Sequence, residues 1–264
     1  MRSKRLALMF WTITCVNLTA CGSSGSSNDQ PAQSTQPPTT DPIDNSARAD
    51  YQVIIYGNSH SAQLGSMLKV LVTSQLPNST IETVTISGRF LDEIVAVSGN
   101  IEQLQQKSWS HAIFQGQKYS QSGTIDYPTD ATQRLIATAK VNNITPILFP
   151  EHPQRGNPSE AERVYNLHQS ISQQEPSCVA PVGQVWNRVL AVMPTVNLYH
   201  ADGNHASYAG NMLSAMTFYE IITGELADAI PYTSALGLEQ QQQALFGQIV
   251  TQVLAEYPAC SNAN

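Results

Sequence analysis

The chain has 264 residues, a length that fits one large domain or two small ones. It carries 13 lysine and arginine residues against 20 aspartate and glutamate residues, which gives a formal net charge of -7. An acidic protein lacks the basic surface that neutralises nucleic-acid phosphates, so the composition argues against a nucleic-acid partner. The four cysteines are too few for a disulfide scaffold and lack the paired spacing of a zinc site. We therefore expect no bound metal and no cofactor.

The N-terminal residues 1–20 have the order of a bacterial export signal. A basic stretch is followed by an apolar run from Leu6 to about Val16, which is short for a membrane span. The run ends in Leu18-Thr19-Ala20-Cys21, which resembles the lipobox of bacterial lipoproteins. The resemblance implies that residues 1–20 are removed and that Cys21 carries lipid, which would tether the protein to the membrane of the bacterial cell envelope. Gly22 after this cysteine is typical of sorting to the outer membrane. Ordinary secretion and an uncleaved anchor helix are the alternatives.

Residues 21–49 are predicted to form a flexible tether, and residues 50–264 the folded domain. The tether is rich in Ser, Gly, Pro, Thr and Gln and has too little apolar surface to offset the entropy of ordering. Removal of the signal also removes three basic residues and no acidic ones, which moves the net charge from -7 to -10 and disfavours a strongly anionic polymer as substrate. Two cysteines remain in the domain, Cys178 and Cys260. An exported chain favours a disulfide between them, with two free buried thiols as the alternative.

Within the domain, short apolar runs alternate with longer segments of helical spacing. The predicted strands are 52–56, 80–86, 111–114, 146–149 and 195–199. The predicted helices are 60–73, 91–97, 130–141, 159–173, 182–192, 207–223 and 238–256. The alternation predicts a three-layer α/β/α fold with a mostly parallel, five-stranded sheet. In such a fold the ligand site lies beyond the carboxyl ends of the strands.

The residues that follow the predicted strands include the groups that serine acyl transfer requires. They are Gly57-Asn58-Ser59-His60, Ser87-Gly88, Gln115-Gly116-Gln117, Glu151-His152 and Asp202-Gly203-Asn204-His205. The set contains a hydroxyl at a strand-to-helix turn and a histidine three residues after an aspartate. A serine nucleophile needs a base to take its proton and a carboxylate to orient that base. A metal site is disfavoured, because no pair among the histidines has the close spacing of zinc ligands.

These segments resemble, in order and spacing, the sequence blocks of a divergent branch of the SGNH/GDSL hydrolases, a family with a flavodoxin-like fold. Gly57-Asn58-Ser59 corresponds to the family's Gly-Asp-Ser, and Gly88 to its glycine after the second strand. Gln115-Gly116-Gln117 corresponds to Gly-X-Asn, and Asp202-Gly203-Asn204-His205 to Asp-X-X-His. Two departures are the Asn at position 58 in place of Asp and the Gln at position 117 in place of Asn.

The resemblance implies a role for each of these residues. Ser59 would be the nucleophile, His205 the general base and Asp202 the residue that orients it. The oxyanion hole would comprise the N–H of Ser59 at a helix start, the N–H of Gly88 and the side-chain amide of Gln117. Four further residues are expected to border the substrate: Asn58, His60, Gln115 (also the fallback oxyanion donor) and His152.

The predicted function is hydrolysis of an acyl ester, for example an acetyl ester of a carbohydrate or a small molecule, through an acyl-enzyme on Ser59. One alternative is a non-catalytic lipoprotein that binds glycans or assists assembly on the same fold. Another is an acyltransferase that passes the acyl group to a sugar hydroxyl. Without the other blocks, Ser59 would be interpreted as a helix cap and Asp202 as a turn residue.

Overall fold

The computed structural model describes residues 48–260. The predicted signal, Cys21 and almost all of the predicted tether therefore lie outside the described residues. Within the described part, no helix combines the length and apolar character needed to cross a membrane.

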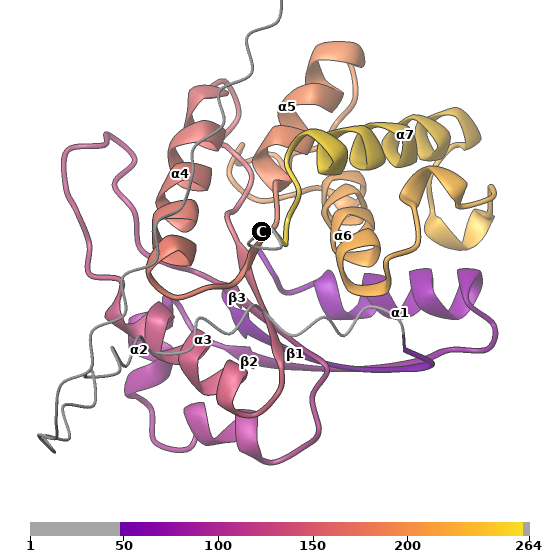
Figure 1. Ribbon diagram of the computed structural model, residues 1–264. Coiled ribbons are helices and arrows are strands. Elements are labelled where there is room, and N and C mark those ends of the chain that lie inside the picture. Colours follow the sequence, from indigo (N-terminus) through magenta and orange to yellow (C-terminus); the bar gives the residue numbers. More distant parts are fainter. Residues whose placement is uncertain (1–47, 261–264) are drawn as a thin grey trace, which may run out of the picture. The chain divides into compact units, whose positions relative to one another are not determined.

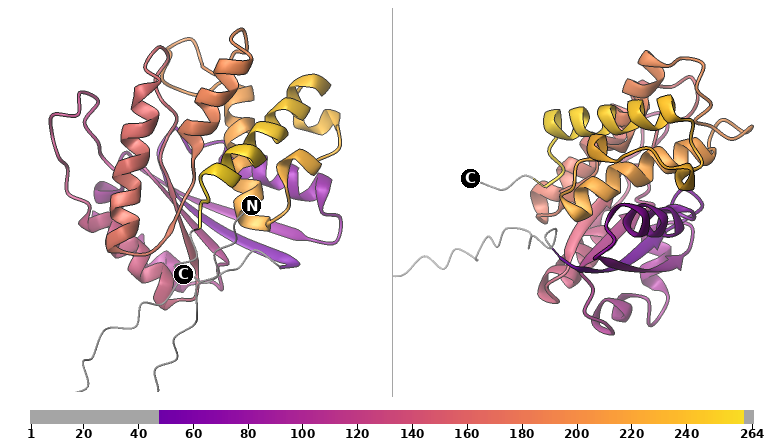
Figure 2. Two further views of the ribbon diagram at one scale, coloured as in Figure 1. Left: turned by 45° about the horizontal axis from the view of Figure 1, so that its top comes forward. Right: turned by 90° about the vertical axis from the view of Figure 1, so that its right-hand side faces the viewer.

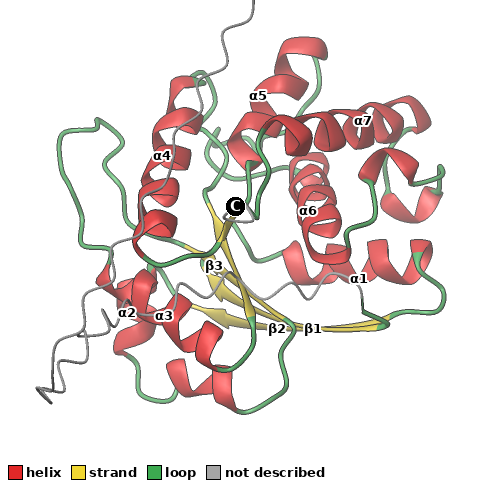
Figure 3. Ribbon diagram, in the orientation of Figure 1, coloured by secondary structure: helices red, strands yellow, loops and turns green. Residues whose placement is uncertain are grey.

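Five parallel strands form the central sheet (Figure 3). They are β1 (Asp50–Gly57), β2 (Thr80–Ser87), β3 (His111–Gln115), β4 (Thr145–Phe149) and β5 (Cys178–Val179), and they pair in the order β2-β1-β3-β4-β5. Helices cover both faces, so the predicted three-layer α/β/α fold is confirmed. The sequence alternates between the two faces as a strand requires: Val53 and Ile55 pack into one core cluster, and Ile54 and Tyr56 into the other.

One core cluster lies between the sheet and a group of four helices (Figure 1). These are α1 (Leu64–Gln75), α5 (Val182–Val192), α6 (Tyr208–Thr223) and α7 (Gln240–Glu256). The short 3-10 helices η2 (Ala227–Ala229) and η3 (Ser234–Leu236) connect α6 to α7. Helix α7 packs on α5, α6 and η2 and so forms the outer part of this layer (Figure 2).

The opposite face of the sheet is covered by a second group of helices. They are α2 (Leu91–Ala96), η1 (Ile101–Gln105), α3 (Asp130–Val141) and α4 (Ser159–Gln174), of which α4 contributes Tyr165 and Ile171 to the second core cluster. The site described below lies where this layer and the first one meet the carboxyl ends of β1, β3 and β4.

The prediction of a fifth strand at 195–199 is wrong. The fifth strand is Cys178–Val179, which pairs with β4, whereas the only pairing at 195–199 that the described residues show is a single antiparallel bridge from Tyr199 to Ala206. Leu198 and Tyr199 are nevertheless buried in the first core cluster. The apolar pattern therefore reported burial in the core, which does not require a strand.

Cys178 and Cys260 form a disulfide with an S–S distance of 2.05 Å across a sequence separation of 82 residues. The neighbouring backbone is joined as well, because the N–H of Val179 donates to the carbonyl of Ala259 at 2.7 Å. The segment after α7 is thus fixed to the edge strand of the sheet.

Candidate active site

Three polar side chains from two distant segments form a continuous hydrogen-bonded chain. The hydroxyl of Ser59 lies 2.9 Å from Nε2 of His205, and Nδ1 of the same ring lies 2.6 Å from Oδ2 of Asp202. Because the carboxylate accepts a hydrogen bond from Nδ1–H, the proton of the neutral imidazole stays on Nδ1. Nε2 is then free to accept a hydrogen bond from the Ser59 hydroxyl. This is the geometry in which a serine loses its proton to a histidine.

Asp202 is held in place by its own loop. Its Oδ1 accepts from the backbone N–H groups of Asn204 and His205, each at 2.9 Å, while Oδ2 faces the imidazole. The hydrogen bond to the His205 side chain, with these two N–H groups, holds the pKa of Asp202 well below its usual range. The carboxylate therefore stays ionised and keeps His205 in the required tautomer, although 44% of the Asp202 side chain and 42% of the His205 side chain are exposed.

The loop 199–206, which carries Asp202 and His205, is tied to the segment after β4. The guanidinium of Arg155 donates to the carbonyl of His200 at 3.0 Å and lies 5.3 Å from the ring centre of Tyr199. The backbone N–H of Arg155 donates to the carbonyl of Gly203 at 2.8 Å. Gln154 adds a side-chain bond to Asn204 at 3.2 Å. These contacts take the place of the ladder that a fifth strand at 195–199 would have provided.

Ser59 lies in a series of turns directly after the interior strand β1. The N–H of Ser61 donates to the carbonyl of Asn58, that of Ala62 to Ser59, and that of Leu64 to Ser61. Helix α1 begins only at Leu64, so the expectation that Ser59 stands at a helix start is wrong. The turn needs a glycine at position 57, because a Cβ there would lie 2.3 Å from the Ser61 hydroxyl and 2.6 Å from the Gln115 side chain.

Asn58 joins this turn to two other strand ends. Its backbone N–H donates to Gln115 Oε1 at 2.8 Å, and its Nδ2 donates to the carbonyl of Arg89 at 2.8 Å. Its Oδ1 accepts from the N–H of His60 at 3.0 Å, which is an Asx turn. Asn58 borders the cleft, as expected, and the contacts show that it also fixes the position of the nucleophile turn.

Two of the expected oxyanion donors are already used within the protein. The N–H of Gly88 donates to the carbonyl of Gly57 at 2.9 Å. The glycine is required there by Ile94, whose Cγ1 would lie 2.3 Å from a Cβ at position 88. A backbone N–H has a single hydrogen, so in this conformation Gly88 cannot bind an oxyanion, contrary to the prediction.

The side chain of Gln117 is also engaged. Its Nε2 donates to the carbonyls of Lys118 at 2.9 Å and Pro128 at 3.1 Å, and its Oε1 accepts from the Thr132 hydroxyl at 2.6 Å. Both amide hydrogens are therefore used to brace the loop that follows β3. The predicted donation by Gln117 to an oxyanion does not agree with this arrangement.

Several backbone N–H groups at the cleft remain unused, and three of them lie in the nucleophile turn or on the segments next to it. Among the described residues, the N–H groups of Ser59, Arg89 and Gly116 donate no hydrogen bond, and all three residues border the cleft. The segments that carry them converge, since Asn58 binds the carbonyl of Arg89 and the N–H of Leu91 donates to the carbonyl of Gly116 at 3.0 Å. Gly116 has φ of +100°, a conformation that favours glycine.

Gln115 and His152 lie beneath the cleft surface and do not border it. Gln115 is fully buried and links the nucleophile turn to Glu151, whose Oε2 accepts from its Nε2 at 2.9 Å. His152 stacks on Trp186 with ring centres 3.8 Å apart, and burial, with His60 nearby, lowers its pKa to about 3. The expectation that these two residues contact substrate is therefore wrong, because both side chains are used for packing and bridging.

His60 does face the cleft, next to the proposed base. Its ring stacks on that of His205 with centres 5.0 Å apart, and its Nε2 lies 4.0 Å from Glu151 Oε2. Glu151 in turn accepts from the hydroxyl of Tyr119 at 3.0 Å. Burial, with the carboxylates of Glu151 and Glu160, raises the pKa of Tyr119, so its hydroxyl remains a donor.

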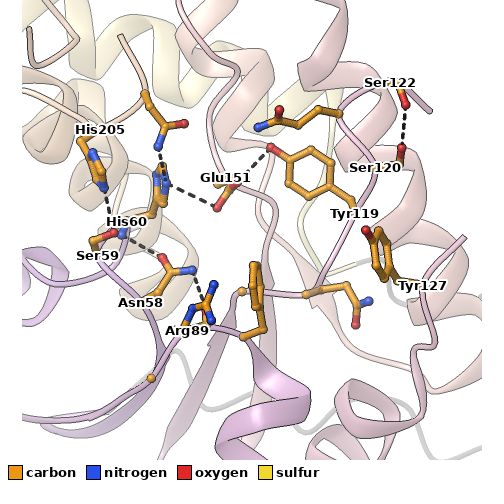
Figure 4. A pocket seen from close by; sticks show the side chains of 16 residues that line it. Asn58, Ser59, His60, Arg89, Tyr119, Ser120, Ser122, Tyr127, Glu151 and His205 are labelled. Atoms are coloured by element: carbon orange, nitrogen blue, oxygen red, sulfur yellow. Dashed lines mark hydrogen bonds and ion pairs between the residues drawn. The ribbon is translucent and has the colours of Figure 1, made fainter. Parts of the chain in front are cut away.

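The cleft at this site has a volume of about 830 Å³ (Figure 4). Ser59, His60 and His205 lie at one end of the view in Figure 4, Glu151 and Tyr119 in the middle, and Tyr127 with Ser120 and Ser122 at the other end. Gly88, Arg89, Phe90, Gly116, Gln117, Gln121, Asn58 and Asn204 complete its lining. Within residues 48–260 no group of three or more His, Cys, Asp or Glu side chains is arranged to hold a metal ion.

Comparison with solved structures identifies the fold. A protein from Slackia heliotrinireducens, provisionally described as an SGNH hydrolase, matches with a TM-score of 0.51 at 19% identity, over 65% of this chain and 98% of that one. A DUF4886 family protein from Bacteroides uniformis matches with a TM-score of 0.60 at 13% identity, over 80% of this chain and 96% of that one. The chain has the SGNH hydrolase fold. At these identities the likeness extends to the SGNH fold alone, and the sequence matches no protein-family model and no curated protein.

Sequence reasoning did not anticipate two parts of this SGNH-fold site. Arg155 has no motif of its own, although it stands in the segment after a predicted strand, where site residues collect. Glu151 stands in the same segment, and the sequence places it after a predicted strand without indicating a role for it. Its position after the fourth strand was the available signal, because that strand end opens on the same edge of the sheet as Ser59.

Proposed function

We propose that this protein is a serine ester hydrolase that acts through an acyl-enzyme on Ser59. The observation that carries the proposal is the unbroken chain from Ser59 through His205 to Asp202, at 2.9 Å and 2.6 Å, at one end of an open cleft. The SGNH fold of the chain supports it, as does the provisional description of the Slackia heliotrinireducens protein as an SGNH hydrolase.

The first half of the reaction breaks the ester bond. Ser59 Oγ attacks the carbonyl carbon while its proton moves to Nε2 of His205, and Asp202 stabilises the resulting imidazolium. The negative oxygen of the tetrahedral intermediate would accept hydrogen bonds from the unused N–H groups of Ser59, Arg89 and Gly116. When this intermediate collapses, the carbon–oxygen bond to the alcohol breaks, and His205 returns its proton to the departing alkoxide.

The second half restores the enzyme. Water attacks the acyl carbon, gives a proton to His205 and forms a second tetrahedral intermediate in the same place. Its collapse releases the carboxylic acid and transfers the proton back to Ser59 Oγ. In an acyltransferase, a hydroxyl group of an acceptor would attack the acyl-enzyme in place of water and would receive the acyl group.

The lining of the cleft favours a short acyl group. Phe90, Tyr119 and Tyr127 supply the large aromatic side chains of the lining, and none of the described residues that line the cleft has an aliphatic side chain. A long acyl chain would lose the burial that it needs, at roughly 0.8 kcal/mol for each methylene. We propose an acetyl-sized acyl group on a carbohydrate or a related small molecule.

We also propose a cellular localisation. The N-terminal pattern that resembles a lipobox would attach the protein through Cys21 to a membrane of the bacterial cell envelope, with the outer membrane as the expected destination. Metabolic labelling with radioactive palmitate tests this localisation. The wild-type protein should be labelled and recovered in the membrane fraction, and a Cys21→Ala variant should be neither.

Labelling of the purified protein by a fluorophosphonate tests the chemistry, alongside hydrolysis of 4-nitrophenyl acetate. The wild type should react at one serine and release nitrophenol, and Ser59→Ala should do neither. Ser66→Ala is the matched control, since Ser66 is an exposed serine of α1 that binds only the carbonyl of Gln63. Equal labelling and hydrolysis in Ser59→Ala would refute the proposed function.

A further inference from the structure

We infer that Glu151 recognises the alcohol part of the ester, and that this alcohol is a neutral sugar with free hydroxyl groups. The inference rests on the proposed function, because it takes Ser59 as the point where the acyl group is held. It assigns to the remainder of the cleft a ligand class and a specificity-determining residue.

The position of Glu151 follows from its neighbour His60. His60 is next to Ser59 in the chain and stacks on His205 at 5.0 Å, while its Nε2 lies 4.0 Å from Glu151 Oε2. Glu151 therefore stands one side chain away from the reacting groups, in the middle of the cleft (Figure 4). An alcohol group extending from an ester at Ser59 into the body of the cleft would pass this carboxylate.

The carboxylate is oriented by neutral donors, and the nearest basic group that the described residues bring to it is the His60 ring at 4.0 Å. Gln115 Nε2 donates to Oε2 at 2.9 Å. The Tyr119 hydroxyl lies 3.0 Å from Oε1 and 3.1 Å from Glu160 Oε1, so its single hydrogen is shared between the two carboxylates and both Glu151 oxygens keep a free lone pair. Within the described part of the chain, no lysine or arginine forms an ion pair with Glu151, and only 17% of its side chain is exposed. A carboxylate in this position gains most from a ligand that brings hydroxyl donors.

The rest of the cleft suits a sugar ring. Phe90, Tyr119 and Tyr127 offer aromatic faces, and 38% of Tyr127 is exposed. Sugar rings present apolar C–H faces that stack on such side chains, while their hydroxyls need polar partners. Those partners are available in Ser120, Gln121 and Ser122, which border the same space.

The charges in the cleft select a neutral ligand. Arg89 borders the cleft with its guanidinium 5.8 Å from the ring centre of Phe90, and this cation would repel a cationic alcohol. Glu151 would in the same way repel a carboxylate. An uncharged sugar is repelled by neither Arg89 nor Glu151, and its hydroxyl groups can form hydrogen bonds with either side chain.

Three acetyl esters that differ only in their alcohol test the inference: an acetylated methyl glucoside, ethyl acetate and acetylcholine. We expect the wild type to favour the glucoside ester over ethyl acetate by at least tenfold in kcat/KM, and to use acetylcholine least. In Glu151→Gln the ratio of kcat/KM between glucoside ester and ethyl acetate should fall about tenfold, the loss expected for one charge-assisted hydrogen bond. The control Glu162→Gln, on the exposed face of α4, should keep the wild-type ratio.

A wild type without preference for the glucoside ester, or with preference for acetylcholine, overturns the inference, as does an unchanged ratio in Glu151→Gln. Ser59-dependent hydrolysis with any of these results leaves the proposed function standing. Binding separates the two further: in the Ser59→Ala background, the acetylated methyl glucoside should bind several times more weakly when Glu151 is also replaced by Gln, measured by NMR titration. This titration measures binding at the alcohol subsite even if the protein hydrolyses no ester. Equal affinity of Ser59→Ala and of the double variant with Glu151→Gln would count against the inference.

Discussion

Arg155 holds the loop that carries Asp202 and His205, and its replacement by methionine should slow the reaction without weakening substrate binding. The guanidinium contributes a charge-assisted bond of 3.0 Å to the carbonyl of His200 and a cation–π contact of 5.3 Å with Tyr199. Because Arg155 is exposed to solvent, we take low values for both contacts, which together stabilise the loop by about 2 kcal/mol.

That free energy corresponds to a fall of up to about 30-fold in kcat, since each 1.4 kcal/mol is a factor of about ten, and we expect at least fivefold. KM should change by less than twofold, because Arg155 does not border the cleft. Steady-state kinetics with 4-nitrophenyl acetate gives both constants, and the rate of fluorophosphonate labelling of Ser59 should fall in parallel with kcat. Arg155→Lys keeps the charge and should recover part of the loss.

Arg188→Met is the control for loss of a surface arginine. Arg188 forms an exposed ion pair with Glu256 at 2.7 Å and, among the described residues, no hydrogen bond or ion pair with the loop 199–206, so its loss should leave kcat unchanged. If Arg155→Met retains the wild-type kcat, the other contacts of the loop suffice to hold it, and the positioning argument is refuted.

Three further predictions concern the oxyanion site, the disulfide and a buried histidine. Gln117→Ala should lower kcat for 4-nitrophenyl acetate by less than tenfold, because its amide hydrogens are already used; a loss of about 100-fold or more would restore it as an oxyanion donor. Cys260→Ser should lower the free energy of unfolding in urea by about 4–5 kcal/mol, as expected for opening an 82-residue loop; reductant should do the same to the wild type and nothing further to the variant. Burial lowers the pKa of His168 from 6.5 to about 4. As the pH falls from 6.5 toward 4, the unfolded chain therefore takes up a proton at this histidine that the folded chain does not. The free energy of unfolding falls as a result. At pH 5 His168 contributes about 2 kcal/mol to this loss. His168→Leu should lack that contribution and keep the similar one from His152, whereas His200→Gln, at an exposed position, should show the full wild-type loss; parallel pH profiles for all three proteins would contradict the assignment.

The sequence predicts the layers of the fold well because apolar periodicity reports burial, and burial in this protein follows the strands and helices. The first four predicted strands agree with β1 to β4 to within three residues at each end. The same signal fails at 195–199, where Leu198 is buried without a strand partner, and it misses the two-residue strand Cys178–Val179. A strand this short has no periodicity of its own and is defined only by its pairing with β4.

The candidate site is predictable to the extent that it rests on spacing. The structure brings Ser59, Asp202 and His205 together from positions more than 140 residues apart, as the resemblance implied. The donors Gly88 and Gln117 illustrate the limit. Whether an N–H is free depends on distant partners, here the carbonyls of Gly57 and Pro128, and no local pattern in the sequence records those contacts.

The nucleophile and the base belong to parts of the molecule with different local stability. Ser59 lies just after β1, whose residues Val53 to Tyr56 are fully buried between two partner strands. His205 lies on a loop that is held by one bridge, a backbone hydrogen bond from Arg155 and a few side chains. Such loops open at a lower free energy than the core that supports them. Mild denaturant, or a molecule that binds residues 199–206 in an opened conformation, should therefore abolish activity while the core stays folded. Activity should return when the denaturant or the molecule is removed, without global refolding.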